Sequence, residues 1–280
     1  MLRAEDAFSP MPRLRDRLVT RVIDVATAPV RRRFSWPRRG IEPLQIVSAD
    51  GTVLHADLYS PPTLARPLGT VILAHGYRDS RHQLAFLSRP LLSRGHRVLA
   101  LDFRAHGRSE GSRITIGARE ADDVRAVISA ARALESSSGR VAFLGYSMGA
   151  SAYLLAGVEA DVAVLDSPYD TLEDALTARV RRLRLPTRLT TRIATALAAE
   201  GSRRIGLAIA SARPIDRVAQ LTRPTLFVFA SQDPWIGVAT RDAFARALPE
   251  CASLRVVPGG HRLHFSPAWS AAVVGFLAEA

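Results

Sequence analysis

The stretch FLGYSMG, residues 143–149, places a serine between two glycines where an apolar run meets a run of small residues. Residues 145–149 match the pattern G-x-S-x-G, which is typical of a nucleophilic serine when it follows a strand and precedes a helix. Such a serine must sit on a sharp, strained turn, and the two glycines leave room around it. We therefore predict that Ser147 is a nucleophile and not an ordinary loop residue.

A serine hydroxyl is a poor nucleophile unless a neighbouring base accepts its proton. The chain has seven histidines. We select His261, in VVPGGHRLHF, because a loop after the last predicted strand is where an α/β sheet presents catalytic groups. His264, three residues further along, is the alternative base. His75, at the end of TVILAHG, is interpreted as a structural histidine that braces its loop.

The imidazole in turn needs a carboxylate that holds its tautomer and stabilises the imidazolium. Asp233, in FVFASQDPW, follows an apolar run whose strand lies next to the histidine-bearing end of the chain. The order Ser147, Asp233, His261 is the order expected after a G-x-S-x-G serine. Asp166 and the weaker candidate Asp170, both in VLDSPYD, are rival acids. A purely structural alternative is that Asp233 only caps a turn.

Acyl transfer also requires N–H donors that face the oxyanion as it forms. The amide of Met148, directly after the serine, is one candidate, and it begins a helix whose dipole favours negative charge at the same spot. The second candidate is the amide of Tyr77, because Gly76 allows the chain to turn tightly after the apolar run that precedes it. We predict an oxyanion hole formed by these two amides.

The elements that must position these residues are visible in the hydrophobic pattern. Short, nearly continuous apolar runs suit parallel strands covered on both faces, and they occupy residues 70–76, 97–103, 140–146, 162–168, 225–231 and 254–260. Helical patterns lie between them, at about 81–94, 118–135, 148–157, 239–248 and 267–279. Alternation of strand and helix predicts a doubly wound α/β fold, preceded by a hairpin at 43–60 around Asp50-Gly51.

Two segments depart from this alternation. Residues 169–215 contain two or three helical pieces and no strand candidate, so we predict a helical insertion over the sheet, either a lid or ordinary helical decoration. Residues 1–41 form a basic N-terminal helical extension, with its apolar stripe at Leu14, Leu18, Val22 and Val25. Such a helix can rest on a membrane surface, but more often it packs its apolar stripe on its own domain.

Composition narrows the range of functions. A chain of 280 residues that is 48% hydrophobic can form one large α/β domain. The net charge is +12 and all 38 basic residues are arginine. No zinc-finger spacing or RNP-like motif accompanies them, so we interpret the charge as a solvated basic surface and expect no nucleic-acid partner. Attraction to anionic lipid, acyl-CoA or another acidic substrate is the alternative.

Compartment and cofactor are predicted from what the sequence lacks. The single cysteine, Cys251, cannot form an internal disulfide, which fits a reducing cytoplasm. The N-terminal residues do not resemble a signal peptide, and no run approaches the ~18–20 apolar residues of a membrane span. We expect a cytoplasmic location, with peripheral contact to the inner face of the membrane through the basic N-terminal segment as an option. No metal cluster, P-loop or dinucleotide fingerprint is present, so neither cofactor nor metal is expected.

Six segments together resemble the α/β-hydrolase superfamily and occur in the family's order: HGYRDS, ALDFRAHGRSEG, GYSMGAS, LDSPYD, ASQDPW and PGGHRLHF. The resemblance covers about residues 42–280 and is closest to bacterial serine-aminopeptidase-like and dienelactone-hydrolase-like enzymes. It implies an eight-stranded, mostly parallel sheet with helices on both faces. In DFRAHGRSEG, it implies that Asp102, Gly107 and Ser109 shape a turn and do no chemistry.

The resemblance also implies two-step acyl transfer, in which Ser147 forms an acyl-enzyme that water hydrolyses. We therefore predict a serine hydrolase acting on a small acyl ester or thioester. The alternatives are a membrane-surface lipase or lysophospholipase, a serine peptidase for small peptides, and a hydrolase-fold binding protein without activity.

Overall fold

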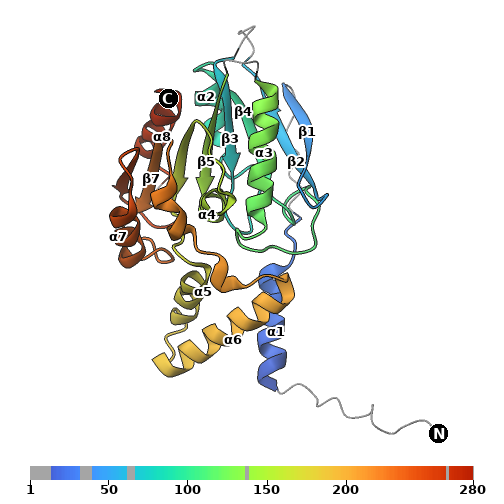
Figure 1. The fold of residues 1–280 in the computed structure, drawn as a ribbon, viewed down its shortest axis with the longest axis vertical. Coiled ribbons are helices and arrows are strands. Elements are labelled where there is room, and N and C mark those ends of the chain that lie inside the picture. Colours follow the sequence, from blue (N-terminus) through green and yellow to red (C-terminus); the bar gives the residue numbers. More distant parts are fainter. Residues whose placement is uncertain (1–13, 32–39, 62–66, 136–138, 263–264, 280) are drawn as a thin grey trace, which may run out of the picture.

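A central eight-stranded sheet organises the computed structural model, which describes residues 14–31, 40–61, 67–135, 139–262 and 265–279. The strand order is β1-β2-β4-β3-β5-β6-β7-β8 (Figure 1). Only the pairs β1–β2 and β2–β4 are antiparallel. The strands are β1 (Ile41–Val47), β2 (Val53–Tyr59), β3 (Gly69–Ala74), β4 (Arg97–Asp102), β5 (Arg140–Tyr146), β6 (Val162–Asp166), β7 (Thr225–Ala230) and β8 (Ala252–Val257). The predicted eight-stranded, mostly parallel sheet is confirmed.

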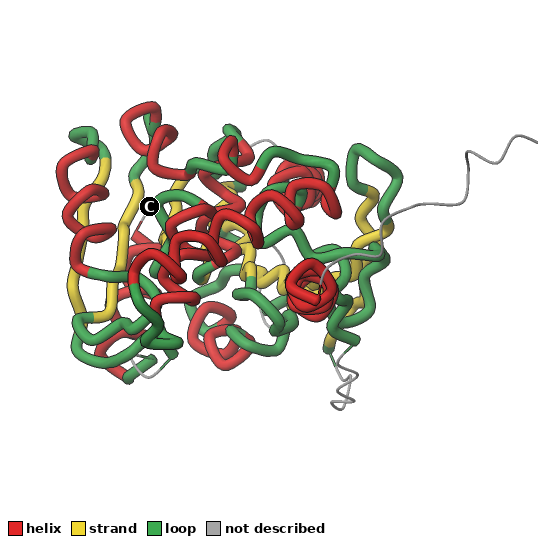
Figure 2. Tube along the Cα trace, turned by 90° about the horizontal axis from the view of Figure 1, so that it is seen from below, coloured by secondary structure: helices red, strands yellow, loops and turns green. Residues whose placement is uncertain are grey.

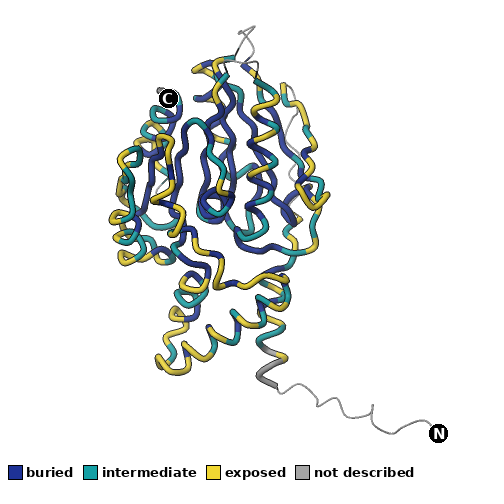
Figure 3. The backbone as a smooth tube through the Cα atoms, in the orientation of Figure 1, coloured by how far each residue is buried: buried dark blue, intermediate teal, exposed yellow. Residues whose placement is uncertain are grey.

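The central strands are mostly apolar because both faces of the sheet are covered. Every residue of β3, β6 and β7 is buried, whereas the edge strand β1 is mostly exposed (Figure 3). The β1–β2 hairpin turns at Asp50-Gly51 as predicted. Gly51 adopts a φ of 83°, and the Thr52 amide donates to Asp50 Oδ1 at 3.1 Å.

Helices cover both faces and form two separate hydrophobic cores. One core includes side chains of α3 (Glu120–Leu134) and α4 (Met148–Ala156), and the other includes side chains of α2 (Ser88–Leu92) and α8 (Pro267–Glu279). The Phe244 side chain of α7 (Val238–Ala247) joins the first core. The predicted helix at 81–94 is instead a turn, a short 3-10 helix, η1 (Ala85–Leu87), and α2. Pro90 lies in the first turn of α2, where a proline needs no backbone donor.

The segment 169–215 is helical, as predicted, and contains no strand. It consists of α5 (Leu172–Arg181), α6 (Thr187–Ile205), the short 3-10 helix η2 (Ile209–Ser211) and the start of η3 (Pro214–Gln220). Helices α5 and α6 lie beyond one end of the sheet, together with α1 (Leu14–Thr27) (Figure 1). Figure 2 views the molecule from this end and shows helices lying across the sheet.

Helix α1 packs against this helical segment, but with a different face from the one its sequence predicts. Ile23 is 4% exposed and lies in a small core with Val180, Ala194 and Leu197. In the predicted stripe, Val22 and Val25 are instead 45% and 61% exposed, and the side chains of Leu14 and Leu18 lie outside the described residues. The prediction that the stripe packs on the domain is therefore wrong for these two valines, because the side of α1 that carries Ile23 is the side that meets α6.

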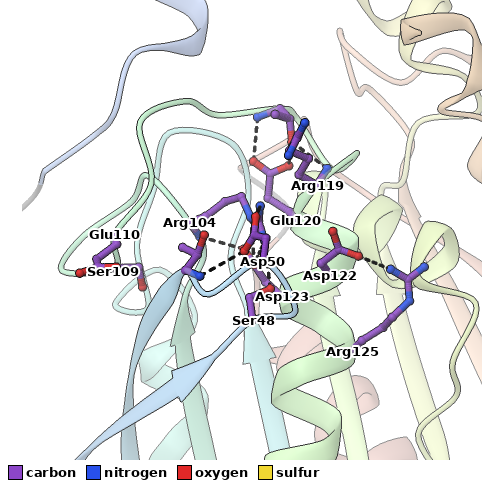
Figure 4. A network of polar contacts seen from close by, with 12 residues as sticks. Ser48, Asp50, Arg104, Ser109, Glu110, Arg119, Glu120, Asp122, Asp123 and Arg125 are labelled. Carbon is purple, nitrogen blue, oxygen red and sulfur yellow. Dashed lines mark hydrogen bonds and ion pairs between the residues drawn. The ribbon is translucent and has the colours of Figure 1, made fainter. Parts of the chain in front are cut away.

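A buried arginine fastens the β1–β2 hairpin to α3 (Figure 4). Arg104 is 4% exposed. Its guanidinium donates to Asp123 Oδ1 at 2.6 and 2.9 Å, to Asp50 Oδ2 at 2.8 Å and to Ser48 Oγ at 3.0 Å. Burial alone lowers the pKa of Arg104, but the hydrogen bonds and charges of Asp123 and Asp50 outweigh it, so the net shift is upward. The arginine is therefore charged, and all three of its guanidinium nitrogens donate hydrogen bonds.

Substituting Arg104→Met is expected to lower the free energy of unfolding by about 3–5 kcal/mol, because removing one partner of a buried ion pair leaves Asp123 buried and uncompensated. Urea unfolding measures this change. Arg213→Met is the matched control, since its ion pair with Asp216 is exposed and should contribute about 1 kcal/mol or less. Equal losses in the two variants would contradict the special role of Arg104.

Candidate active site

Ser147 lies on a sharp turn between β5 and α4, in a conformation that non-glycine residues rarely adopt. Its φ and ψ are 51° and −110°, and such strain costs on the order of 1–3 kcal/mol. The turn is held on both sides. The Ser147 amide donates to the Asp166 carbonyl at 2.7 Å, and the Ser147 carbonyl accepts from the Ser151 amide at 3.0 Å.

The flanking glycines have a more specific role than clearance around the serine. A Cβ at Gly149 would lie 2.5 Å from the Ala74 carbonyl oxygen, and one at Gly145 would lie 2.7 Å from the Ala150 amide nitrogen. These contacts are with the backbone of β3 and of α4, neither of which can move aside easily. The glycines therefore let strand and helix close tightly around the turn that projects Ser147.

The structure brings Ser147, His261 and Asp233 into one chain of hydrogen bonds. His261 Nε2 lies 3.0 Å from Ser147 Oγ, and His261 Nδ1 lies 2.5 Å from Asp233 Oδ2. An ionised carboxylate accepts hydrogen bonds but has no proton to donate, so His261 Nδ1 must carry the proton that faces Asp233. The Nε2 lone pair then faces the serine hydroxyl. This is the arrangement a histidine needs to act as a base toward Ser147.

Asp233 satisfies both interpretations of its sequence position at once. Its Oδ1 accepts from the amides of Trp235 and Ile236 at 2.8 and 3.0 Å, which caps the turn. Its Oδ2 is left for His261, and the side chain is 1% exposed. The turn therefore orients the carboxylate, so the cap and the contact with histidine are parts of one arrangement.

The rival acids are engaged elsewhere. Asp166 Oδ2 accepts from the indole Nε1 of Trp269 at 2.8 Å, and its Oδ1 accepts from Ser167 Oγ at 2.8 Å. Asp170 accepts from Thr240 Oγ1 at 3.1 Å and from the amide that follows it. The rival base His264 lies outside the described residues.

His75 braces its loop, and that prediction is confirmed. It is 1% exposed; its Nε2 accepts from the Phe103 amide at 3.1 Å, so Nδ1 donates to the Gly76 carbonyl at 2.7 Å. Burial lowers the pKa of His75 well below its ordinary value, and the neighbouring His106 lowers it further. A neutral imidazole with both nitrogens occupied has no capacity left for proton transfer.

The two predicted oxyanion donors lie on the segments that frame the serine. A Cβ at Gly76 would lie 2.8 Å from the Tyr146 ring, so the loop after β3 passes directly against the serine-bearing turn. Within the described part of the chain, no protein acceptor takes a hydrogen bond from the amide of Tyr77 or Met148. Both N–H groups are therefore available to a ligand.

Two contacts that support this site were not predicted from the sequence. The Tyr146 hydroxyl donates to the His261 carbonyl at 2.5 Å, which ties the histidine loop to the serine turn, and burial raises the pKa of Tyr146, which keeps the phenol protonated. The Tyr77 hydroxyl donates to the Ala26 carbonyl of α1 at 2.6 Å. A tyrosine next to the serine was a visible signal for the first contact, whereas nothing local indicated the second.

The turn in DFRAHGRSEG is structural, as predicted. Asp102 is fully buried, accepts from the amides of Arg81 and Arg108, and forms an ion pair with the Arg81 guanidinium. A Cβ at Gly107 would lie 2.1 Å from the Asp102 carboxylate, and Ser109 Oγ donates to the Asp102 carbonyl at 2.5 Å. The polar groups of Asp102 and Ser109 therefore hold the loop in its conformation.

No group of three or more histidine, cysteine, aspartate or glutamate side chains in the described residues is arranged to hold a metal ion. None of the described helices is long and apolar enough to cross a membrane.

The sheet order and the strained serine turn define a protein with an α/β-hydrolase fold. Residues 71–273 match the model of the alpha/beta hydrolase family, and the chain belongs to this family. Among solved structures, it resembles the esterase Pf2001 of Pyrococcus furiosus, with a TM-score of 0.72 and 22% identity over 91% of this chain and 98% of the esterase. An esterase of Exiguobacterium antarcticum gives a TM-score of 0.62 and 17% identity over 85% of this chain and 100% of its own.

Two curated relatives differ in how much of their length is matched. A monoacylglycerol lipase of Mycolicibacterium smegmatis is 28% identical in an alignment 237 positions long, which covers 72% of this chain and 83% of the lipase. The uncharacterized protein YqkD of Bacillus subtilis is 28% identical over 179 residues, and the match spans 62% of this chain but only 58% of YqkD. The chain is thus an alpha/beta hydrolase similar to esterases and to a lipase.

Proposed function

We propose that this protein is a serine hydrolase that cleaves carboxylic esters through an acyl-enzyme on Ser147. The observation that carries the proposal is the continuous chain from Asp233 through His261 to Ser147 Oγ, with separations of 2.5 and 3.0 Å. Asp233 keeps the proton on Nδ1 and stabilises the imidazolium that forms when Nε2 takes the serine proton.

The chemistry follows from this geometry in two steps. Ser147 Oγ attacks the ester carbonyl carbon while its proton passes to His261 Nε2, and the carbonyl oxygen becomes an oxyanion. The amides of Tyr77 and Met148 donate to that oxyanion, and loss of one such donor typically costs about 2.7–4 kcal/mol of barrier. The protonated Nε2 then gives its proton to the leaving alkoxide. Water, deprotonated by the same nitrogen, attacks the acyl-enzyme and releases the acid.

Esters are the favoured substrate because the similar proteins described above are named as esterases and as a monoacylglycerol lipase. Thioesters and small peptides would use the same groups and differ only in the leaving atom. A panel of p-nitrophenyl esters of increasing chain length, together with acyl-CoA, ranks these classes by kcat/KM. If kcat/KM were higher for acyl-CoA than for every ester, thioesters would be the substrate class instead of esters.

The direct test of the mechanism is covalent labelling with a fluorophosphonate, followed by mapping of the modified peptide. A single phosphonate on Ser147 is expected, because only an activated serine reacts quickly. Excess p-nitrophenyl ester should slow the labelling by competing for the same group. Absence of labelling, or labelling of a different serine, would contradict the proposal.

A second candidate, a hydrolase working at a membrane surface, is favoured by the outward face of α1. Val22 and Val25 are exposed there, and Arg17 and Arg21 on the same helix are exposed as well. Exposed apolar side chains beside arginines are the composition of a helix that lies in the interface of an anionic bilayer. We propose that the protein is cytoplasmic and that α1 makes peripheral contact with the inner face of the membrane.

Co-sedimentation with phosphatidylglycerol vesicles tests this candidate. The protein is expected to pellet with anionic vesicles and less with phosphatidylcholine vesicles. The double variant, which carries both Val22→Asp and Val25→Asp, should not pellet with the vesicles, because burying carboxylates in the membrane interface is unfavourable. Val47→Asp is the matched control, since Val47 is 64% exposed on the edge strand β1. Equal pelleting of all three proteins would exclude α1 as the contact.

A further inference from the structure

Arg179 of α5 and Arg182, which directly follows that helix, stack on aromatic rings that belong to the loops of the candidate site. The Arg179 guanidinium carbon lies 5.2 Å from the ring centroid of Trp235 and 5.8 Å from that of Tyr77. The Arg182 guanidinium carbon lies 4.2 Å from the Trp235 ring. Helix α5 lies against the end of the sheet at which these loops emerge (Figure 1).

The two rings belong to loops that follow strands on either side of the serine-bearing strand. Tyr77 follows β3, and its amide is one of the two proposed oxyanion donors. Trp235 follows β7, and its amide donates to Asp233 Oδ1. Strands β5 and β6 lie between β3 and β7 in the sheet, and Ser147 directly follows β5. Arg179 therefore bridges two loops that emerge at the same edge of the sheet as the Ser147 turn.

The positive charge between these two loops has no carboxylate partner in the described part of the chain. Other arginines with little exposure pair with aspartates there: Arg81 with Asp57 and Asp102, and Arg104 with Asp50 and Asp123. Arg179 is only partly exposed, yet its hydrogen bond is to a carbonyl, that of Ala175, at 3.0 Å.

An arginine has five N–H donors, so most of the donor capacity of Arg179 faces no protein acceptor in these residues. Burial lowers the pKa of Arg179, and Tyr77 and Tyr169 offset this only in part. Removing a cation from water without an anionic partner is unfavourable. An anion supplied by a ligand at this position would relieve that cost.

We propose that Arg179, supported by Arg182, forms an anion subsite at the entrance to the active site, so that preferred substrates are esters carrying a carboxylate or phosphate in addition to the scissile ester. The guanidinium fork binds such groups through paired N–H donors. The rings of Tyr77 and Trp235 hold the fork in place by cation–π contact. This subsite rests on the proposed ester hydrolysis at Ser147 and specifies its substrate class.

The test compares matched esters with and without the extra charge. Mono-p-nitrophenyl glutarate carries the anion on the acyl part, and its methyl-capped form is the neutral control; 4-acetoxybenzoate and phenyl acetate are the corresponding pair for the leaving group. The ratio of kcat/KM for the anionic to the neutral member is expected to exceed one for at least one pair. Arg179→Gln should lower that ratio at least about tenfold, mainly through KM, because the contact is made in ground state and transition state alike.

Two further variants separate recognition from structure. Arg181→Gln is the matched control, since Arg181 is exposed on the same helix, and two residues along a helix turn a side chain about 200° away; it should keep the wild-type ratio. Arg179→Lys should restore the ratio only in part, because an ammonium lacks the planar fork.

A measurement without turnover keeps the outcome decisive. Glutarate and inorganic phosphate should raise the melting temperature of the wild-type protein and of Arg181→Gln, but not that of Arg179→Gln. Turnover of neutral esters with no charge preference, and no thermal shift, would overturn the subsite while leaving the hydrolase proposal intact. Absence of all turnover and labelling, with the thermal shift preserved, would instead overturn the hydrolase.

Discussion

Replacing Ser147 by alanine is expected to lower kcat for p-nitrophenyl ester hydrolysis by about 10⁶-fold, the effect seen when a serine of this kind is removed. The reason is geometric, because His261 Nε2 lies 3.0 Å from Ser147 Oγ and would have no other hydroxyl to deprotonate. The residual rate should reflect binding and the two amide donors alone. Steady-state kinetics at high enzyme concentration measures it. A kcat close to that of the wild-type protein would rule out Ser147 as the nucleophile.

The strained backbone at this residue offers an independent check. Ser147→Gly should be as inactive as the alanine variant but more stable, by about 1 kcal/mol or more, since glycine adopts a positive φ without strain. Chemical denaturation of the two variants compares them directly. If the glycine variant were less stable than the alanine variant, the backbone at residue 147, with its φ of 51°, would not be strained.

Replacing Asp233 by asparagine is expected to lower kcat by about 10⁴-fold with little change in KM. An asparagine NH₂ group facing Nδ1 would donate and not accept, which favours the tautomer with its proton on Nε2 and removes the lone pair that faces Ser147. The Oδ1 contacts to the amides of Trp235 and Ile236 can be kept by the amide oxygen, so the turn should survive. Kinetics with an ester substrate, supported by circular dichroism, measures this.

Asp170→Asn is the control for this substitution, because Asp170 is the nearby rival whose contacts are with Thr240 and Thr171. It should retain most of the activity. A larger loss in Asp170→Asn than in Asp233→Asn would reverse the assignment of the acid and contradict the contact between His261 Nδ1 and Asp233 Oδ2.

The strands and the serine turn were predictable because they depend on local patterns. Runs of five to seven apolar residues mark strands buried on both faces, and G-x-S-x-G after such a run marks a turn that only small neighbours permit. The order Ser147, Asp233, His261 was predictable for a related reason, since each residue directly follows, or lies just beyond, a predicted strand. Parallel strands bring their carboxyl ends to the same edge of the sheet, so residues far apart in sequence converge there.

Contacts between elements that are distant in sequence were decided only by the tertiary structure. The face of α1 that is buried depends on where α6 lies, so the helical spacing of Val22 and Val25 identified an apolar stripe but not its burial. The Tyr146–His261 contact and the stacking of Arg179 on Tyr77 join segments about a hundred residues or more apart in the sequence. Arg179 also stacks on Trp235, which lies beyond the next strand, β7. Sequence by itself determined which groups could do chemistry and at which edge of the sheet they meet; packing alone decided which side chains surround them, because that depends on how whole elements are placed.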